Sequence, residues 1–477
     1  MSGMRTACLP RVMIAAEKSG QGKTLLTCVL LSLLMDMGVE AQGFKCGPDY
    51  IDPMYHCYVT GRPSCNLDSF LAGERNLTGI LGRHGEAPAD CGRVCTRVAL
   101  LEGVMGYYDG ISGLTVRASS YETARLTDTP VILVVDAAGR SLSVLAALKG
   151  FLTYQEDSRI RGVIFNRLSP MLYPGLKDET ERLFDVRVIG YVPKMKEFSL
   201  ESRHLGLVTP EELPGLREEI VKLADRLRPG LDLEALLSLA REAGLLSWEE
   251  PSAYLEHAEE RNRQQPVIAV ARDEAFCFYY EDNLRALTQA GAHLVFFSPL
   301  WDSALPAGTD GLYLGGGYPE LHAEKLYENQ EMRGKIRLAL QKGLPCIAEC
   351  GGYLYLKEWL ADTKGRQWPM AGVLPGGSAD SGRLSHFGYG LMTLESAGLL
   401  GDRGDCFPVH EFHHWETGTE GRAFSINKPG RASGRKCGYM TDTLYAGFPH
   451  LYFYGSDIAQ RFVEKAAGQH TKRTKTE

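Results

Sequence analysis

The stretch Ser19-Gly20-Gln21-Gly22-Lys23-Thr24 constrains the fold more than any other part of the chain. An apolar run at residues 12–16 predicts a buried strand before it, and residues 25–35 predict a helix after it. Strand, glycine-rich turn and helix form the context of a phosphate-binding loop, although an ordinary glycine-rich turn is the alternative. We expect backbone N–H groups and the helix N-terminus to bind nucleotide phosphates. The predicted nucleotide contacts are Ser19, Gly20, Gly22, Lys23 and Thr24, and Thr24 is also a predicted Mg²⁺ ligand.

Composition narrows the class of protein. The chain has 477 residues and 44% apolar residues, enough for two or more domains with sizeable cores. Its net charge of −7 argues against nucleic acid as the main partner. Residues 25–35 are too short to cross a bilayer, and no signal peptide is visible. In so long a chain, 12 cysteines do not predict a disulfide framework. A reduced, cytoplasmic enzyme without a membrane partner is the expectation.

Polar side chains end several predicted strands of the first half. Runs at 39–45, 130–136, 160–167 and 186–193 alternate with helical stretches, which predicts an α/β fold with a doubly wound parallel sheet. Asp136 and Asn166 lie at strand ends, where open α/β sheets bind ligands. Lys45 precedes a Gly- and Pro-rich turn that carries Asp49 and Asp52. These groups are placed to face a ligand, although the turn taken alone is better explained as solvated.

The second half begins a new α/β series, with strands expected at 266–271, 294–300, 311–314 and 344–348. The last of these strands leads into the sharp turn Glu349-Cys350-Gly351-Gly352 and then a helix starting near Tyr353. A nucleophile at the apex of such a turn is exposed and activated by the helix N-terminus. Gly316 and Gly317 follow another strand and, with Gly351, are predicted to present N–H groups to an oxyanion or to glutamine; a tight turn is the alternative. Cys350 is therefore the predicted catalytic nucleophile.

Two stretches carry a family resemblance. Residues 44–56 (FKCGPDYIDPMYH) and 101–110 (LEGVMGYYDG) resemble signatures of the cobyrinic acid a,c-diamide synthase family. The resemblance implies an N-terminal P-loop domain like that of dethiobiotin synthetases and a C-terminal class I glutamine amidotransferase-like domain. It implies that Asp49 or Asp52, together with Glu102, holds Mg²⁺-ATP, and that Asn166 contacts adenine. Lys45, Asp49 and Tyr50 are the candidate substrate contacts.

The resemblance also implies the chemistry. Its position makes His450 the base of a Cys350–His450 dyad, because Tyr452 stands where many triad-type amidotransferases carry a glutamate. This departure predicts a slow or conditional glutaminase. The implied reaction is ATP- and glutamine-dependent amidation of the a and c carboxylates of cobyrinic acid through an acyl phosphate. Hydrogenobyrinic acid and nickel-sirohydrochlorin are alternative tetrapyrrole substrates.

Predicted boundaries are an ATP-binding domain at 1–245 with a helical connection, a linker at 246–265, a glutaminase domain at 266–468 and a frayed tail at 469–477. His410-Glu411-Phe412-His413-His414 matches the zinc-protease pattern, but no amphipathic helix surrounds it. From a different class, residues 18–24 resemble the loop of partition-type switch ATPases except at Ser19. That alternative leaves Cys350 without a role. The sequence leaves the oligomeric state open, with a homodimer among the alternatives.

Overall fold

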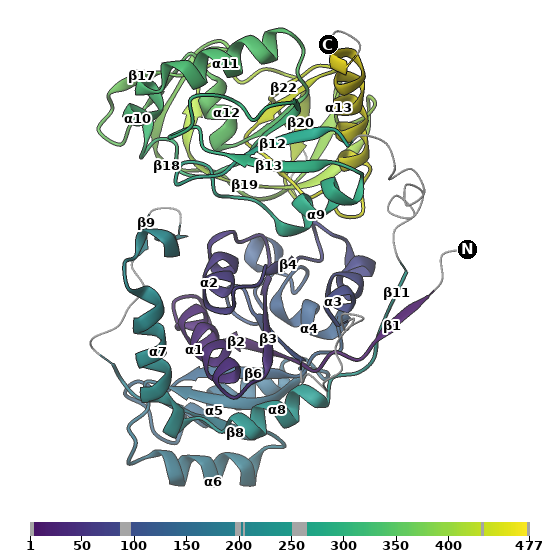
Figure 1. Ribbon diagram of the computed structural model, residues 1–477. Coiled ribbons are helices and arrows are strands. Elements are labelled where there is room, and N and C mark those ends of the chain that lie inside the picture. The colour runs from purple at the N-terminus through teal and green to yellow at the C-terminus, as the bar shows by residue number, and fades with distance from the viewer. Residues whose placement is uncertain are drawn as a thin grey trace. The chain divides into compact units, whose positions relative to one another are not determined.

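The computed structural model describes residues 4–85, 97–195, 202–203, 206–249, 265–430 and 434–474. The chain forms two compact units, Met1–Glu250 and Pro251–Glu477, each with its own sheets and helices. Figure 1 shows the first unit in purple to teal and the second in green to yellow.

The first unit is built on a seven-stranded parallel sheet in the order β4-β3-β5-β2-β6-β7-β8. The strands are β2 (Arg11–Ala16), β3 (Glu40–Cys46), β4 (Cys65–Leu67), β5 (Arg97–Glu102), β6 (Val131–Asp136), β7 (Ile160–Asn166) and β8 (Arg187–Val192). After β2 the chain forms β3, β4 and β5 on one side of β2, and it then crosses to form β6 on the other side. The carboxyl end of β2 is therefore a topological switch point, where doubly wound sheets bind ligands. The predicted doubly wound parallel sheet is confirmed.

Helices cover this sheet. They are α1 (Lys23–Asp36), α2 (Ile51–Thr60), α3 (Leu77–Gly85), α4 (Ser120–Leu126), α5 (Ser143–Thr153), α6 (Tyr173–Leu183), α7 (Leu216–Leu227) and α8 (Leu233–Arg241). Helix α1 packs against α2 and α7, and the three lie together in Figure 1. Helix α1 is apolar nearly all round, as expected for a helix buried between a sheet and other helices.

The predicted linker start at residue 246 is wrong. Helix α8 ends at Arg241, and the next residues form β11 (Leu246–Trp248), which pairs antiparallel with β1 (Arg5–Ala7). Trp248 is 2% exposed and lies so close to α3 that a Cβ on Gly82 would come within 2.3 Å of its ring. Packing of this tryptophan therefore extends the first unit past the predicted boundary. The rest of the predicted linker, from residue 250 to residue 264, lies outside the described residues.

The second unit contains two larger sheets. The first has the order β13-β12-β14-β15-β23-β22 and is parallel except for β22. Its strands are β12 (Val267–Ala271), β13 (His293–Phe297), β14 (Thr309–Leu314), β15 (Cys346–Glu349), β22 (Tyr439–Met440) and β23 (Leu444–Gly447). The second sheet comprises β16 (Trp359–Ala361), β17 (Gln367–Pro369), β18 (Gly377–Leu394), β19 (Cys406–Thr417), β20 (Phe424–Asn427), β21 (Arg435–Cys437) and β24 (His450–Leu451). Long hairpin strands β18 and β19 form its centre.

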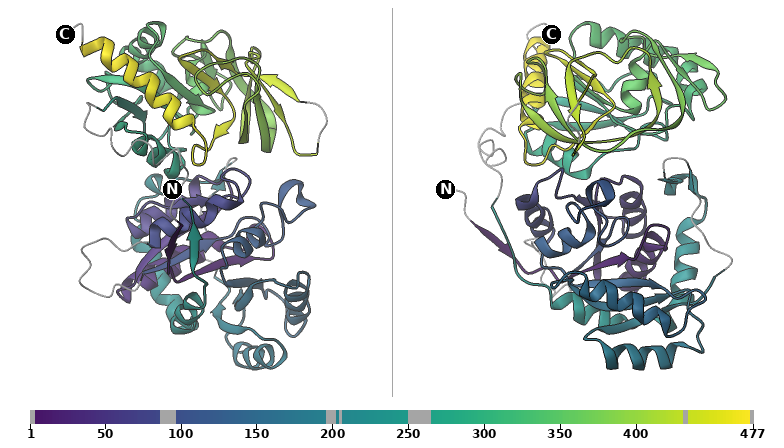
Figure 2. Two further views of the ribbon diagram at one scale, coloured as in Figure 1. Left: turned by 90° about the vertical axis from the view of Figure 1, so that its right-hand side faces the viewer. Right: turned by 180° about the vertical axis from the view of Figure 1, so that it is seen from behind.

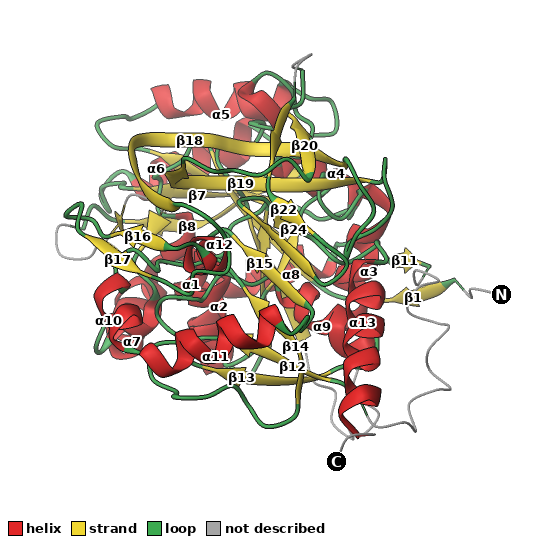
Figure 3. Ribbon diagram, turned by 90° about the horizontal axis from the view of Figure 1, so that it is seen from above, coloured by secondary structure: helices red, strands yellow, loops and turns green. Residues whose placement is uncertain are grey.

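The helices of this unit are α9 (Glu281–Gln289), α10 (Ala323–Glu328), α11 (Gln330–Gln341), α12 (Gly351–Leu356) and α13 (Ile458–Thr474). Helix α12 packs against β14, β15 and β23 and lies beside β15 in Figure 3. It begins two residues before Tyr353, where the sequence predicted a start. None of the helices in the described ranges is long and apolar enough to cross a membrane.

The frayed tail predicted at 469–477 is not observed over 469–474, and residues 475–477 lie outside the described residues. Helix α13, yellow in Figure 2, runs to Thr474 and packs against β12, β14 and α9. It approaches β14 closely because a Cβ on Gly311 would already lie 3.3 Å from Ala466. Gln469 donates to the carbonyl of Gly343 at 2.8 Å, which ties the helix at this residue to the turn after α11.

Candidate active sites

The loop between β2 and α1 has the backbone of a phosphate-binding turn. Gly20 and Gly22 have φ angles of +75° and +76°, a region that favours glycine. Two side chains brace the loop. Asn166, at the end of β7, donates to the carbonyl of Gln21 at 2.9 Å, and the Gln21 side chain donates to Glu17 at 2.9 Å. The structure therefore places the predicted adenine contact Asn166 directly against the loop.

Lys23 begins α1 beside this turn, and Ser19 is exposed in the turn itself. The Lys23 ammonium donates to the carbonyls of Met105 at 2.6 Å and Lys18 at 3.4 Å. Burial, and secondarily the ammonium of Lys45, lowers the pKa of Lys23 to about 8. A phosphate group would further stabilise the charged ammonium, because an opposite charge favours ionisation.

Four predicted residues meet at the carboxyl edge of the sheet next to this loop. Thr24 Oγ1 lies 2.8 Å from Glu102 Oε1 and 3.2 Å from Asp52 Oδ1. Lys45 Nζ lies 2.5 Å from Asp52 Oδ2 and 3.0 Å from Glu102 Oε1. The sheet register explains the meeting, because Lys45 of β3 is the direct partner of Glu102 of β5, while Asp52 comes from the first turn of α2. We name Thr24, Lys45, Asp52 and Glu102 the carboxylate cluster.

Charges in the carboxylate cluster compensate one another. Burial acts to raise the pKa of Glu102, but the Lys45 ammonium and a hydrogen bond from His56 outweigh it and hold this pKa far below its usual range. Burial acts to lower the pKa of Lys45, but Asp52 and Glu102 outweigh it and raise this pKa. Lys45 and Glu102 are therefore charged at neutral pH in the interior of the first unit.

Asp49, Tyr50 and His56 surround this cluster in different ways. Asp49 accepts the backbone N–H of Ile51 at 2.9 Å and so caps α2, and Tyr50 is the residue immediately before that helix. His56 Nε2 lies 2.7 Å from Glu102 Oε2, and its Nδ1 lies 3.1 Å from Ser64 Oγ. His56 was not among the predicted site residues, although it belongs to the 44–56 motif and follows Asp52 by four residues on α2.

The donor set of the carboxylate cluster fits Mg²⁺. Mg²⁺ binds through one or two carboxylates, a hydroxyl and substrate phosphates rather than in an all-protein cage. Thr24, Asp52 and Glu102 supply these oxygens, and the phosphate-binding loop adjoins them. Among the described residues no group of three or more His, Cys, Asp or Glu side chains is arranged to hold a metal ion.

In the second unit, Cys350 occupies the sharp turn between β15 and α12. Its φ of 44° and ψ of −99° are unusual for a residue with a side chain, as is typical of a nucleophile elbow. A Cβ on Gly352 would lie 2.2 Å from the Leu314 carbonyl, so glycine is required after the turn. Cys350 is only 7% exposed, and burial, followed by the Glu320 carboxylate, raises the pKa of its thiol. The prediction that the elbow exposes and activates the thiol is therefore wrong for this structure, because the resting thiol is buried and protonated and needs a base.

The predicted oxyanion glycines converge on this turn. A Cβ on Gly351 would lie 3.1 Å from the backbone N of Gly317 and 3.3 Å from the carbonyl carbon of Gly316. A Cβ on Gly316 would lie 2.6 Å from Cε1 of His450. The structure thus brings the elbow, the 316–317 turn and the predicted base into one centre. Close backbone approach explains why the chain has glycine at all three positions.

His450 lies in β24 and pairs in register with His410 of β19. It is 2% exposed, and burial lowers its pKa to about 3, so the imidazole is neutral at rest. Its Nδ1 lies 4.0 Å from a carboxylate oxygen of Glu349, the residue before the nucleophile. Glu349 was not among the predicted site residues, because this contact depends on how β15 and β24 pack.

The zinc-protease pattern lies on strand β19. On a strand, residues four apart are separated by roughly 13 Å, so His410 and His414 are too far apart to bind one zinc ion. Glu411 is fully buried and pairs with Lys428 at 3.2 Å and Arg435 at 2.5 Å, and His413 stacks on Phe448 with ring centres 3.8 Å apart. These contacts give the motif a role in packing and charge pairing within this sheet.

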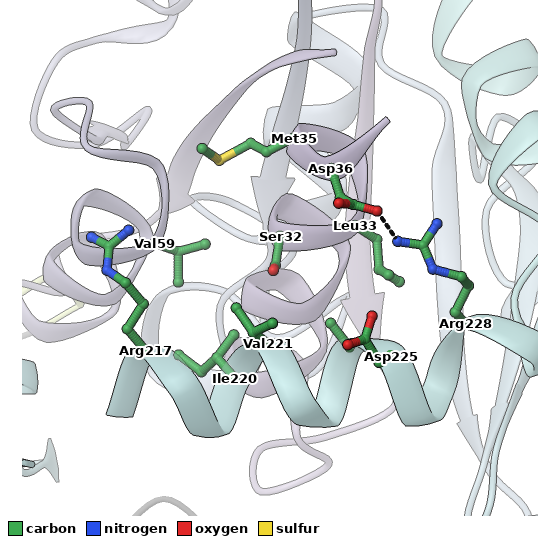
Figure 4. Close-up of a pocket in the computed structure, with 11 residues that line it drawn as sticks. Ser32, Leu33, Met35, Asp36, Val59, Arg217, Ile220, Val221, Asp225 and Arg228 are labelled. Carbon is green, nitrogen blue, oxygen red and sulfur yellow. Dashed lines mark hydrogen bonds and ion pairs between the residues drawn. The ribbon is translucent and has the colours of Figure 1, made fainter. Parts of the chain in front are cut away.

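A further pocket lies between α1, the end of α2 and α7 (Figure 4). Arg217 of α7 and Arg228, the residue directly after α7, lie at its two ends, and the Arg228 guanidinium pairs with Asp36. None of the predicted site residues lines this pocket.

Comparison with known proteins assigns both units. Residues 12–208 match the family described as the CobQ/CobB/MinD/ParA nucleotide binding domain, and residues 267–458 match the CobB/CobQ-like glutamine amidotransferase domain. Cobyrinate a,c-diamide synthase of Caldanaerobacter subterraneus subsp. tengcongensis is 38% identical over 95% of this chain and 98% of its own length. The Listeria innocua enzyme of that name is 39% identical over 93% of this chain and 96% of its own length. The Priestia megaterium enzyme is 36% identical over 97% of this chain and 98% of its own length.

Fold and sites together define an enzyme in which a P-loop nucleotide-binding domain precedes a glutamine amidotransferase domain. The full-length likeness is more specific. The chain belongs to the cobyrinate a,c-diamide synthase family, a family of glutamine-dependent amidating ligases. The partition-type ATPase alternative is not favoured, because it gives no role to residues 267–458.

Proposed function

We propose that the chain amidates the a and c carboxylates of cobyrinic acid, with ATP activating each carboxylate and glutamine supplying nitrogen. One observation carries the proposal. A chain that matches cobyrinate a,c-diamide synthases over almost its full length combines a cysteine–histidine centre with a phosphate-binding loop beside buried carboxylates.

Glutamine hydrolysis follows from the second unit. His450 takes the proton of the Cys350 thiol, and the thiolate attacks the side-chain amide carbon of glutamine. Backbone N–H groups of Gly317 and Gly351 stabilise the oxyanion of the tetrahedral intermediate. The histidine returns the proton to the leaving nitrogen, ammonia departs, and water then hydrolyses the thioester to glutamate and the free thiol.

Carboxylate activation follows from the first unit. A substrate carboxylate oxygen attacks the γ-phosphorus of ATP, ADP leaves, and ammonia then attacks the acyl carbon and expels phosphate. Lys23 and the N–H groups of the loop hold the phosphates during this transfer. Thr24, Asp52 and Glu102 would hold Mg²⁺, which when bound neutralises phosphate charge.

The remaining site residues have supporting roles. Asn166 is the proposed adenine contact, and its hydrogen bond to Gln21 places it at the nucleotide loop. Asp49 and Tyr50, beside the first turn of α2, are the proposed substrate contacts. Lys45 is 3% exposed, so we assign its ammonium to the carboxylates of Asp52 and Glu102 rather than to the substrate.

A steady-state assay of Cys350→Ser tests the proposal. The variant and the wild type receive Mg²⁺-ATP and cobyrinic acid with either glutamine or ammonium. We expect the glutamine-dependent rate of the variant to fall at least about 1,000-fold, because the nucleophile is lost, and its ammonium-dependent rate to stay near that of the wild type.

Parallel assays of the wild type with hydrogenobyrinic acid and nickel-sirohydrochlorin identify the tetrapyrrole by the highest kcat/KM. If kcat/KM is higher for either compound than for cobyrinic acid, that compound is the substrate, and the proposed chemistry of the two sites is unchanged. ATP hydrolysis without amide formation from any of the three would contradict the proposed function.

A further inference from the structure

Glu349 is a buried carboxyl group that the proposed chemistry leaves unused. It ends β15, directly before the nucleophile, and is 2% exposed. Its Oε1 accepts the backbone N–H of Leu451 at 2.9 Å, and its Oε2 accepts the hydroxyl of Tyr313 at 2.9 Å. The same Oε2 lies 4.0 Å from His450 Nδ1. The two hydrogen-bond donors are neutral, so an ionised Glu349 requires the imidazolium of His450 to balance its charge.

The position where amidotransferase triads often carry their acid is otherwise engaged. Tyr452, two residues after the histidine, donates its hydroxyl to Asp282 at 2.8 Å in a buried contact. The backbone around it is fixed as well, because Asn283 donates to the Leu451 carbonyl and accepts the Phe453 N–H, each at 2.8 Å. Strand β24 is thus held between Asn283 and Glu349.

We propose that Glu349 is the positioning carboxylate of the glutaminase centre, which orients His450 and balances its imidazolium, so that the centre is a triad rather than a dyad. This inference rests on the proposed function of Cys350 and His450. Glu349 ends β15, directly before the nucleophile Cys350. Its carboxyl group also accepts the N–H of Leu451, the residue that follows His450 in β24.

The proton balance predicts conditional activity. Burial raises the pKa of Glu349 to about 8, lowers that of His450 to about 3 and raises that of the Cys350 thiol, so all three groups are neutral at rest. Activation releases the Glu349 proton to solvent and moves the Cys350 proton to His450. The active state holds a carboxylate, an imidazolium and a thiolate, and it carries one proton fewer than the resting state.

The tyrosines packed around Glu349 stay protonated in this range. The tyrosines that face it have pKa values raised well above normal by burial: Tyr279, Tyr313 of β14 and Tyr445 of β23. The wild-type glutaminase rate should therefore rise about tenfold between pH 7 and pH 9, as expected for one controlling carboxyl with a pKa near 8.

The test compares Glu349→Gln, Glu349→Asp and Tyr313→Phe in the full chain with an exposed control, Glu328→Gln on α10. Glutamate release gives kcat and its pH profile, iodoacetamide alkylation of Cys350 reports thiolate formation, and ammonium-dependent amidation reports the other site. We expect Glu349→Gln to lower kcat about 100-fold and flatten the pH rise in both kcat and alkylation. Glu349→Asp, which keeps the charge, should retain at least about ten times more activity than Glu349→Gln.

Tyr313→Phe removes a hydrogen bond that favours the carboxylate, so both profiles should move to higher pH. If Glu349→Gln does not fold, Tyr313→Phe still tests the inference. The pH profiles of kcat and of Cys350 alkylation would overturn it if Tyr313→Phe left both unchanged. A Glu349→Gln enzyme with wild-type kcat and pH profile would also overturn it. Loss of glutaminase in Cys350→Ser alone would then leave the proposed function intact, whereas an active Cys350→Ser would refute that function first.

Discussion

Lys45→Met should destabilise the first unit strongly. The Lys45 ammonium lies 2.5 Å from Asp52 and 3.0 Å from Glu102, and the Glu102 side chain is fully buried. Methionine fills a similar volume without the charge, so two buried carboxyls lose their shared cation. Removing one partner of a buried ion pair costs about 3–5 kcal/mol. For a unit of this size that free energy lowers Tm by about 6–20 °C.

Differential scanning calorimetry of the full chain at pH 7 measures this shift, with Lys222→Met on the exposed side of α7 as the control. The double variant Lys45→Met/Asp52→Asn should recover part of the loss, because one uncompensated carboxyl is gone. The deficit of Lys45→Met should also shrink toward pH 4. Without Lys45 the Glu102 carboxyl takes up a proton there, whereas in the wild type its low pKa keeps it ionised. A Tm for Lys45→Met equal to that of Lys222→Met would refute the charge assignment.

Two further variants test the sites separately. Gly316→Ala places a methyl 2.6 Å from Cε1 of His450 and should lower the glutaminase rate at least about tenfold, without changing ammonium-dependent amidation. Gly334→Ala on α11, where a Cβ meets no atom within 4 Å, is its control, and equal rates in the two variants would contradict the geometry. His56→Ala removes the 2.7 Å contact to Glu102, so Mg²⁺ titration of the amidation rate should show about tenfold weaker apparent affinity. Unchanged Mg²⁺ dependence would remove His56 from the support of this site.

In the first unit, the elements that could be predicted are those whose sequence pattern lies within one short stretch of the chain. The P-loop, its strand and its helix lie within residues 11–36, and local patterning specifies all three. The Lys45–Glu102 pair was not predictable, because it depends on β5 inserting between β3 and β2. A pattern of polar residues at strand ends shows that they share an edge of the sheet, but it does not show which strands are neighbours.

In the second unit the elbow at Cys350 was predictable for the same reason, since strand, turn and helix are consecutive. The hydrogen bond between Glu349 of β15 and Leu451 of β24 crosses between two sheets, and no local pattern encodes such a contact. The continuation of α13 through residues 469–474 was not predicted, because all six residues there are polar. The buried residues Phe462 and Ala466, one turn apart, indicate a helix up to residue 466, and residues 469–474 contain no apolar residue that would extend this pattern.

Isotope transfer tests the central claim most directly. Wild type and Cys350→Ser receive cobyrinic acid, Mg²⁺-ATP, glutamine labelled with ¹⁵N in its amide, and unlabelled ammonium, and mass spectrometry gives the nitrogen content of the diamide. We predict ¹⁵N in both new amides of the wild-type product when glutamine outcompetes ammonium, and only ¹⁴N in the product of the variant. ¹⁵N in the product of Cys350→Ser, or its absence from the wild-type product at any glutamine concentration, would contradict the account.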